Sequence, residues 1–130
     1  MTLNELEALV LNKFLDGDSF ALDVLRQQLQ GVKVLSREFT GAGFYTHFEV
    51  DRRASRLITL SKFVLSGVSG SAANVQHGVG FVLFLRAGAL DFLEGFTYDE
   101  PWPEQLIDLH LEYANFRGEN LADLNRAAVI

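Results

Sequence analysis

The stretch VGFVLFLRAGALDFLEGFTY, residues 79–98, decides the fold, because it reads as two strongly apolar strands separated by a tight turn. Valine, leucine and phenylalanine dominate both halves, and Ala87-Gly88 provides the small, flexible pair that a short hairpin turn requires. Both faces of this predicted hairpin are largely apolar, so other elements must cover it. We therefore expect it in the middle of a sheet or under helices. Pairing Leu85 with Leu90 would place Leu83 opposite Phe92, Phe81 opposite Glu94 and Val79 opposite Phe96.

A second hairpin is predicted over residues 32–50, where apolar residues recur at every second position around Gly41-Ala42-Gly43. A two-residue loop would direct three pairs to one face: Phe39 with Phe44, Arg37 with Thr46, and Leu35 with Phe48. The same register would direct two pairs to the other face: Glu38 with Tyr45, and Ser36 with His47. A slip of one residue would exchange the two faces.

Two helices are predicted before this hairpin. Thr2 followed by Glu5 matches a capping box, which marks a helix start. Asp18 or Ser19 can cap a second helix, and Gly31 is placed to end it. Both segments carry an apolar stripe at helical spacing, so we expect them to pack on the sheet.

The rest of the chain adds strands and a helical end. Residues 60–68 predict a strand, and the alternation of IDLHLEY, residues 107–113, favours another, with a short helix after Pro103 as the alternative. Residues 120–130 can form a last helical turn or two. We therefore predict an α+β fold of one domain, residues 1–130, in which two N-terminal helices pack on a mainly antiparallel sheet of about five strands.

Composition indicates a cytoplasmic protein. The chain has 130 residues, of which 48% are hydrophobic and 22% charged, as in ordinary globular domains. It contains no cysteine, which excludes disulfides and thiolate metal sites and fits a reducing compartment. The first residues include acids where a secretory signal carries positive charge, and the longest apolar run, residues 79–85, is too short to cross a membrane.

Charge is distributed unevenly along the chain. Residues 26–62 hold seven basic side chains and three acidic ones, whereas residues 88–125 hold nine acids and only Arg117. With a net charge of −6, this argues against nucleic acid as a partner and suits a basic protein. The alternative is that these carboxylates only solvate the surface.

Glu94 is the first catalytic candidate. Strand alternation places it in a row whose other members are apolar or aromatic: Leu90, Phe92, Phe96 and Tyr98. A carboxylate in such a row must be paired, protonated or beside a cavity, and buried carboxylates of this kind serve as general acids or bases. We expect Arg37 to be its partner, with Tyr45 and His47 as further candidates. The alternative is a structural ion pair.

Metal and cofactor sites are not predicted. His47, His77 and His110 lack the spacing of a zinc site, and the glycine pairs lack the further residues of a phosphate loop. No serine-hydrolase elbow is present. The sequence therefore leans away from an enzyme.

The segment GFTYDEPWP, residues 95–103, contains both prolines and the single tryptophan. Pro101 and Pro103 should end the strand, because proline cannot donate to a sheet, and Trp102 should fold back on the core. The candidate interaction residues are in and beside this segment: Tyr98, Asp99, Glu100, Trp102 and Glu104.

Two blocks, SREFTGAGFYTHFEV and GFVLFLRAGALDFLEGFTYDEPWP, resemble segments of a group of small bacterial proteins with no established activity, and they cover roughly a third of the chain. In size and acidity the chain is also similar to immunity proteins that neutralise toxins. The resemblance assigns no catalytic residue. We therefore expect a protein-interaction module that binds a basic partner. The alternatives are a ligand-binding domain or enzyme with a cavity around Glu94 and Arg37, and a homodimer formed through an exposed strand.

Overall fold

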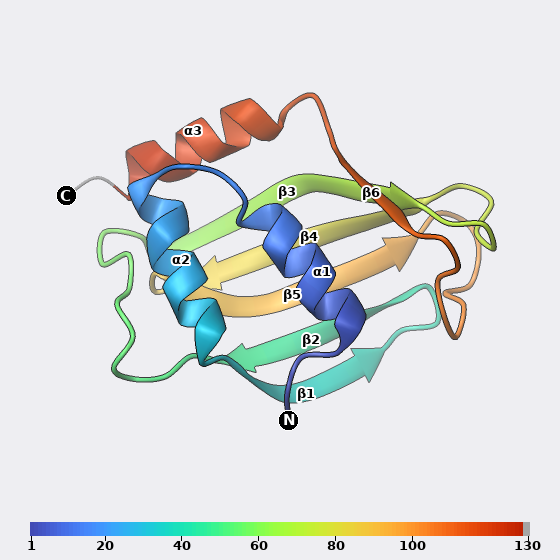
Figure 1. Cartoon of the computed structure of the whole chain (residues 1–130), viewed down its shortest axis with the longest axis horizontal. Coiled ribbons are helices and arrows are strands. Elements are labelled where there is room, and N and C mark those ends of the chain that lie inside the picture. The colour runs from blue at the N-terminus through green and yellow to red at the C-terminus, as the bar shows by residue number, and fades with distance from the viewer. Residues whose placement is uncertain (129–130) are drawn as a thin grey trace.

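The computed structural model describes residues 1–128 and forms an α+β fold, in which helices pack on one antiparallel sheet (Figure 1). The helices are α1 (Glu5–Phe14), α2 (Phe20–Gln30) and α3 (Arg117–Ala127). The strands are β1 (Lys33–Phe39), β2 (Gly43–Glu49), β3 (Lys62–Ser71), β4 (Val79–Arg86), β5 (Ala89–Thr97) and β6 (His110–Tyr113). Their order in the sheet is β1-β2-β5-β4-β3-β6, and each neighbouring pair is antiparallel.

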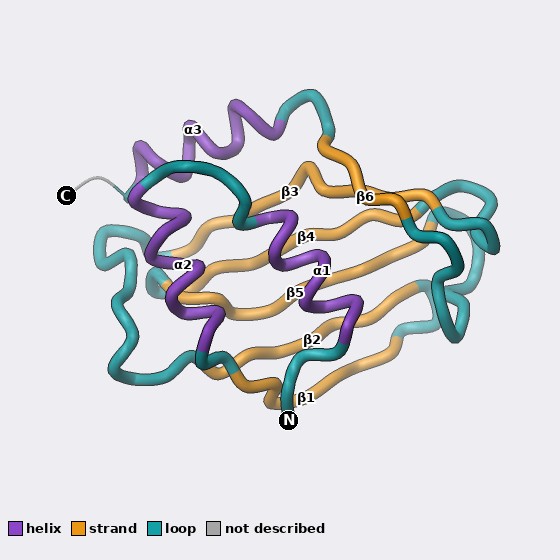
Figure 2. The backbone as a smooth tube through the Cα atoms, viewed as in Figure 1, coloured by secondary structure: helices purple, strands orange, loops and turns teal. Residues whose placement is uncertain are grey.

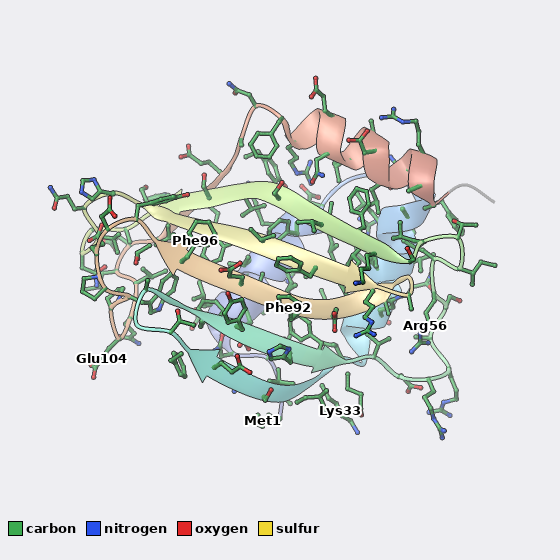
Figure 3. All side chains as sticks on the ribbon, turned by 180° about the vertical axis from the view of Figure 1, so that it is seen from behind. Met1, Lys33, Arg56, Phe92, Phe96 and Glu104 are labelled. Atoms are coloured by element: carbon green, nitrogen blue, oxygen red, sulfur yellow. The ribbon has the colours of Figure 1, made fainter. Side chains whose placement is uncertain are left out.

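The helices cover only one face of this sheet. Helices α1 and α2 cross that face, and α3 packs beside β3 and near α2 (Figure 2). Within residues 1–128 no helix crosses the opposite face, which Figure 3 shows from behind. We call this opposite side the open face. The same part of the chain contains no helix that is long and apolar enough to cross a membrane.

The predicted fold class is confirmed, and its details differ. The sheet has six strands, because the alternating segment contributes β6 at one edge. Helix α3 is 11 residues long rather than a turn or two, and the last two residues of the predicted segment lie outside the described residues. At the N-terminus the capping box is formed by Asn4 and Glu7, two residues later than predicted, because each of these side chains accepts the backbone N–H of the other.

The central hairpin β4–β5 is in the middle of the sheet, as expected. Its turn also follows the prediction, since Ala87 and Gly88 both have positive φ angles, 51° and 72°. Glycine is required at Gly88, where a Cβ would lie 2.3 Å from the carbonyl oxygen of Leu57. Leu85 faces Leu90 as predicted.

A bulge in β5 between Leu90 and Phe92 makes the rest of the predicted register wrong. Leu83 pairs with Leu93 rather than Phe92, because one extra residue of β5 lies between the Leu85 and Phe84 pairs. Leu93 therefore points into the core, and Phe92 and Glu94 point to the open face. The expected row is broken at this bulge, since Leu90 is buried with the core.

The first hairpin, β1–β2, follows its predicted register from Phe39 to Ser36. A second bulge between Val34 and Ser36 then pairs Phe48 with Val34 instead of Leu35. Leu35 is consequently 57% exposed, and Val34 takes its place in the core. The prediction for Leu35 was therefore wrong, because hairpin loop length cannot reveal a bulge further along the strand.

Gln28 ties α2 to the central hairpin. Its side chain is 1% exposed, and its Nε2 donates to the carbonyl oxygens of Ser55 and Gly88 at 2.8 and 3.0 Å. Its Oε1 accepts the backbone N–H of Leu90 at 3.0 Å. One amide thus satisfies three backbone groups around the β4–β5 turn.

Replacing Gln28 with leucine should lower the free energy of unfolding by about 2 to 3 kcal/mol, because the buried N–H of Leu90 loses its acceptor. Urea denaturation measures this loss. The matched control is Gln27→Leu on the exposed side of the same helix, which should change stability by less than about 0.5 kcal/mol. Equal losses in the two variants would contradict a bridging role for Gln28.

Candidate functional site

Arg37 and Glu94 lie on opposite faces of the sheet. Arg37 pairs with Thr46, whose side chain is buried under the helices, whereas Glu94 pairs with Tyr45 on the open face. The expected Arg37–Glu94 pair is therefore wrong. Adjacent residues of a strand point to opposite faces of the sheet. Tyr45 and Thr46 are adjacent on β2, so Glu94, which pairs with Tyr45, and Arg37, which pairs with Thr46, point to opposite faces.

The partner of Arg37 is Glu7 on α1. The Arg37 Nε and Nη2 atoms donate to Glu7 Oε2 and Oε1, both at 2.8 Å. Thr46 Oγ1 donates to Oε2 at 2.6 Å, and the backbone N–H of Asn4 donates to Oε1 at 2.8 Å. Each carboxylate oxygen thus accepts two hydrogen bonds, and Glu7 is 1% exposed.

These contacts set the protonation state of Glu7. Burial raises the pKa of its carboxyl, but the hydrogen bonds from Arg37, Thr46 and Asn4 outweigh burial and hold the pKa below its ordinary value. The same pairing raises the pKa of Arg37, because the hydrogen bonds to Glu7 favour the charged guanidinium. Glu7 is therefore a charged, structural carboxylate in the native protein. Glu7 was not among the site residues predicted from the sequence.

A groove of about 540 Å³ opens above this ion pair. It lies between α1, the adjoining ends of β1 and β2, and the segment 102–109. Its apolar lining consists of Leu6, Leu9, Phe39, Phe44, Trp102, Leu106 and Leu109. Its polar lining consists of Asn4, Glu5, Glu7, Arg37, Glu104 and Gln105. We call this feature the α1 groove.

Trp102 forms one wall of the α1 groove. Its ring packs edge-on against Phe44 and Phe81, with centroids 5.2 and 6.4 Å apart. Its backbone N–H donates to the carbonyl oxygen of Gly41 at 2.8 Å, which fixes the segment against the β1–β2 turn. The prediction that Trp102 folds back on the core is confirmed.

The positive charge of the groove is paired within the chain, whereas two of its negative charges are free to contact a ligand. The Arg37 guanidinium is held by Glu7 and also donates to the carbonyl oxygen of Thr2 at 2.9 Å. Glu5 and Glu104 are exposed, and neither forms an ion pair within residues 1–128. The rim of the groove therefore presents negative charge to a ligand.

Three of the predicted interaction residues, Tyr98, Asp99 and Glu100, do not line the α1 groove. Tyr98 lies beside Phe96, with ring centroids 5.4 Å apart, and Asp99 occupies a turn with a φ of 55°. Glu100 accepts the backbone N–H groups of Gln76 and His77 at 3.0 and 2.8 Å, which lowers its pKa. Glu100 thus holds a neighbouring loop in place. Of the predicted set, Trp102 and Glu104 line the groove.

The remaining catalytic candidates, Tyr45 and His47, lie with Glu94 on the open face. The Glu94 carboxylate raises the pKa of the Tyr45 hydroxyl by electrostatic repulsion and as a hydrogen-bond acceptor. His47 Nε2 lies 3.6 Å from Glu38 Oε1. None of these residues belongs to the lining of the α1 groove, so they share no cavity with Arg37. Within residues 1–128 no group of three His, Asp or Glu residues is placed to hold a metal ion.

Comparison of the chain with protein-family models, with curated proteins and with solved structures gives no match.

Replacing Glu7 with glutamine should lower the free energy of unfolding by about 2 to 3 kcal/mol at neutral pH, because Arg37 loses its charged partner. The native pKa of Glu7 is depressed, so its contribution is complete above its unfolded pKa of about 4.3 and is lost as pH falls through the native value. The difference between wild type and variant should therefore shrink in acid. Denaturant unfolding measured across a pH series checks this.

The control is Glu5→Gln, an exposed carboxylate in the same helical turn, which should cost less than about 1 kcal/mol. A wild-type advantage over Glu7→Gln that stays constant down to strongly acidic pH would argue against a charged Glu7.

Proposed function

We propose that this protein is an interaction module that binds a basic segment of a partner protein in the α1 groove. One observation carries the proposal: the groove combines apolar walls with a rim whose available charges are the carboxylates of Glu5 and Glu104. Its guanidinium, on Arg37, is already paired with Glu7. A complementary ligand therefore combines an apolar side with cationic groups.

The size and lining of the groove support binding of a short peptide segment. Its volume of about 540 Å³ falls within the range of about 300 to 1,000 Å³ that is usual for ligand sites. Trp102 and Phe44 are aromatic anchors, and tryptophan is among the residues that contribute most at interface centres. Phe39 is 76% exposed at the groove, so its ring is available to a partner.

Electrostatics favours a basic partner over an acidic one. The net charge of the chain is −6, and carboxylates at the rim would steer a cationic segment toward the groove. This behaviour is compatible with an immunity-type role, in which an acidic protein neutralises a basic toxin. The alternative of a cavity around Glu94 and Arg37 has lost its geometric basis, because the two residues lie on opposite faces.

Trp102 provides a direct test, since it is the single tryptophan and lines the groove. A synthetic peptide of alternating leucine and lysine should shift its fluorescence, and a matched peptide of leucine and glutamate should not. Binding should weaken as salt is raised. Combined Glu5→Lys and Glu104→Lys substitutions should weaken binding of the lysine peptide about tenfold through charge repulsion.

A double variant, Glu119→Lys with Asp123→Lys, is the matched control, because it makes the same total charge change at exposed positions of α3, away from the groove. Its affinity for the lysine peptide should be that of the wild type. Equal binding of the two peptides, or an unchanged affinity after reversal at the rim, would count against the proposed function.

A further inference from the structure

An apolar band crosses three neighbouring strands of the open face, and the imidazole of His47 continues it on a fourth. Register places Val64, Phe84, Phe92 and His47 side by side on β3, β4, β5 and β2. The rings of Phe84 and Phe92 are stacked with centroids 4.2 Å apart, and His47 lies 5.3 Å from Phe92. Val64 is 46% exposed, and Figure 3 shows Phe92 on a face that no described helix covers. We call this band the central row.

Charged residues of opposite sign flank the central row. On one side, register aligns Glu38 with Tyr45 and Glu94, which we call the acidic row. On the other side, Lys62 pairs with Arg86, and alternation from Val64 and Phe84 directs both to the open face. We call this pair the basic row. Lys33 on β1 and Glu49 on β2 extend the basic row, and because they pair with each other their opposite charges cancel. Asp91 is the bulged residue of β5 beside this row.

This arrangement is complementary to itself. A two-fold axis that runs between two facing sheets, perpendicular to the strands, reverses the direction along the strands. Such an axis places the central rows of two copies against each other and the acidic row of each copy over the basic row of the other. Antiparallel sheets packed face to face in this way are common in proteins.

The area of the face is sufficient for a stable dimer. Strands β1 to β5 contain seven to ten residues each, so at the usual spacings the face measures about 25 Å in both directions. This area is comparable with the ~800 Å² that each partner contributes to a standard interface.

The edges of the sheet are less suitable for self-association than its face. The β1 edge is occupied at Val34, whose N–H and carbonyl oxygen bond to Met1, and a bulge follows at once. The β6 edge has four residues. Both features are ones that proteins use to prevent pairing between strand edges.

We infer that two copies of this chain associate through their open faces, with central row against central row and acidic row against basic row. The contact is isologous. Glu94 of each copy lies over β5 of its partner, about one strand spacing (~4.8 Å) from Arg86 on the neighbouring β4. The α1 groove lies on the helix-covered side of the sheet and stays accessible in such a dimer. This inference is therefore independent of the proposed function.

Sedimentation velocity over micromolar to sub-millimolar concentrations tests the inference. The wild-type chain should sediment as a dimer at the upper end. Glu94→Lys and Arg86→Glu should each weaken self-association at least about tenfold, because each variant opposes like charges at two symmetric positions. Glu119→Lys, with the same charge change on α3, should dimerise as the wild type does, and circular dichroism should show that all variants are folded.

Mixing the two weakened variants distinguishes this geometry from any other dimer. The lysine introduced into the first variant would lie near the glutamate introduced into the second, and the other symmetric position keeps its native pair. An equimolar mixture should therefore form a one-to-one heterodimer. A wild-type chain that stays monomeric throughout would overturn the inference. So would single variants that dimerise like the wild type, or a mixture that does not associate.

Discussion

The ion pair between the buried Glu7 and the partly buried Arg37 is the constraint on which the rest of the structure depends. It joins the first turn of α1 to β1, and Thr46 extends the same network to β2. Because the Asn4 N–H also bonds to Glu7, helix capping and sheet contact are made by one carboxylate. A buried charge of this kind adds little stability over an apolar pair, but it strongly disfavours any register in which Arg37 lacks Glu7. It also neutralises the guanidinium of the α1 groove, which leaves the rim acidic.

Two bulges decide which residues each face presents. The bulge in β5 turns Leu93 into the core and directs Phe92 and Glu94 outward, and the bulge in β1 replaces Leu35 with Val34 in the core. Without the β5 bulge, the residues from Phe92 onward would exchange faces, and a carboxylate would enter the apolar layer. The β5 bulge therefore keeps Glu94 out of the apolar core and also places Phe92 in the apolar band of the open face.

Much of this fold can be predicted from periodicity alone. The central hairpin, the first hairpin near its turn, the N-terminal helices and the position of Trp102 all follow from spacing and turn residues. The bulges cannot be predicted this way, because an extra residue leaves both strands equally apolar. The sequence did contain a signal for Glu7, which shares the helical stripe of Leu3, Val10 and Phe14. A carboxylate on an apolar stripe requires a partner, and Arg37 was already predicted to face an apolar layer.

The two faces of the sheet satisfy their polar groups in different ways. On the helix side, Glu7 and Gln28 are buried and satisfied within the chain, so these groups are not available to a ligand. On the open side, Glu94 and Arg86 belong to rows separated by the central row. In the proposed dimer, each of these charged rows lies against the row of opposite sign on the second copy. A helix-side groove for a ligand and an open face for a second copy can therefore operate in one small domain without competing for the same residues.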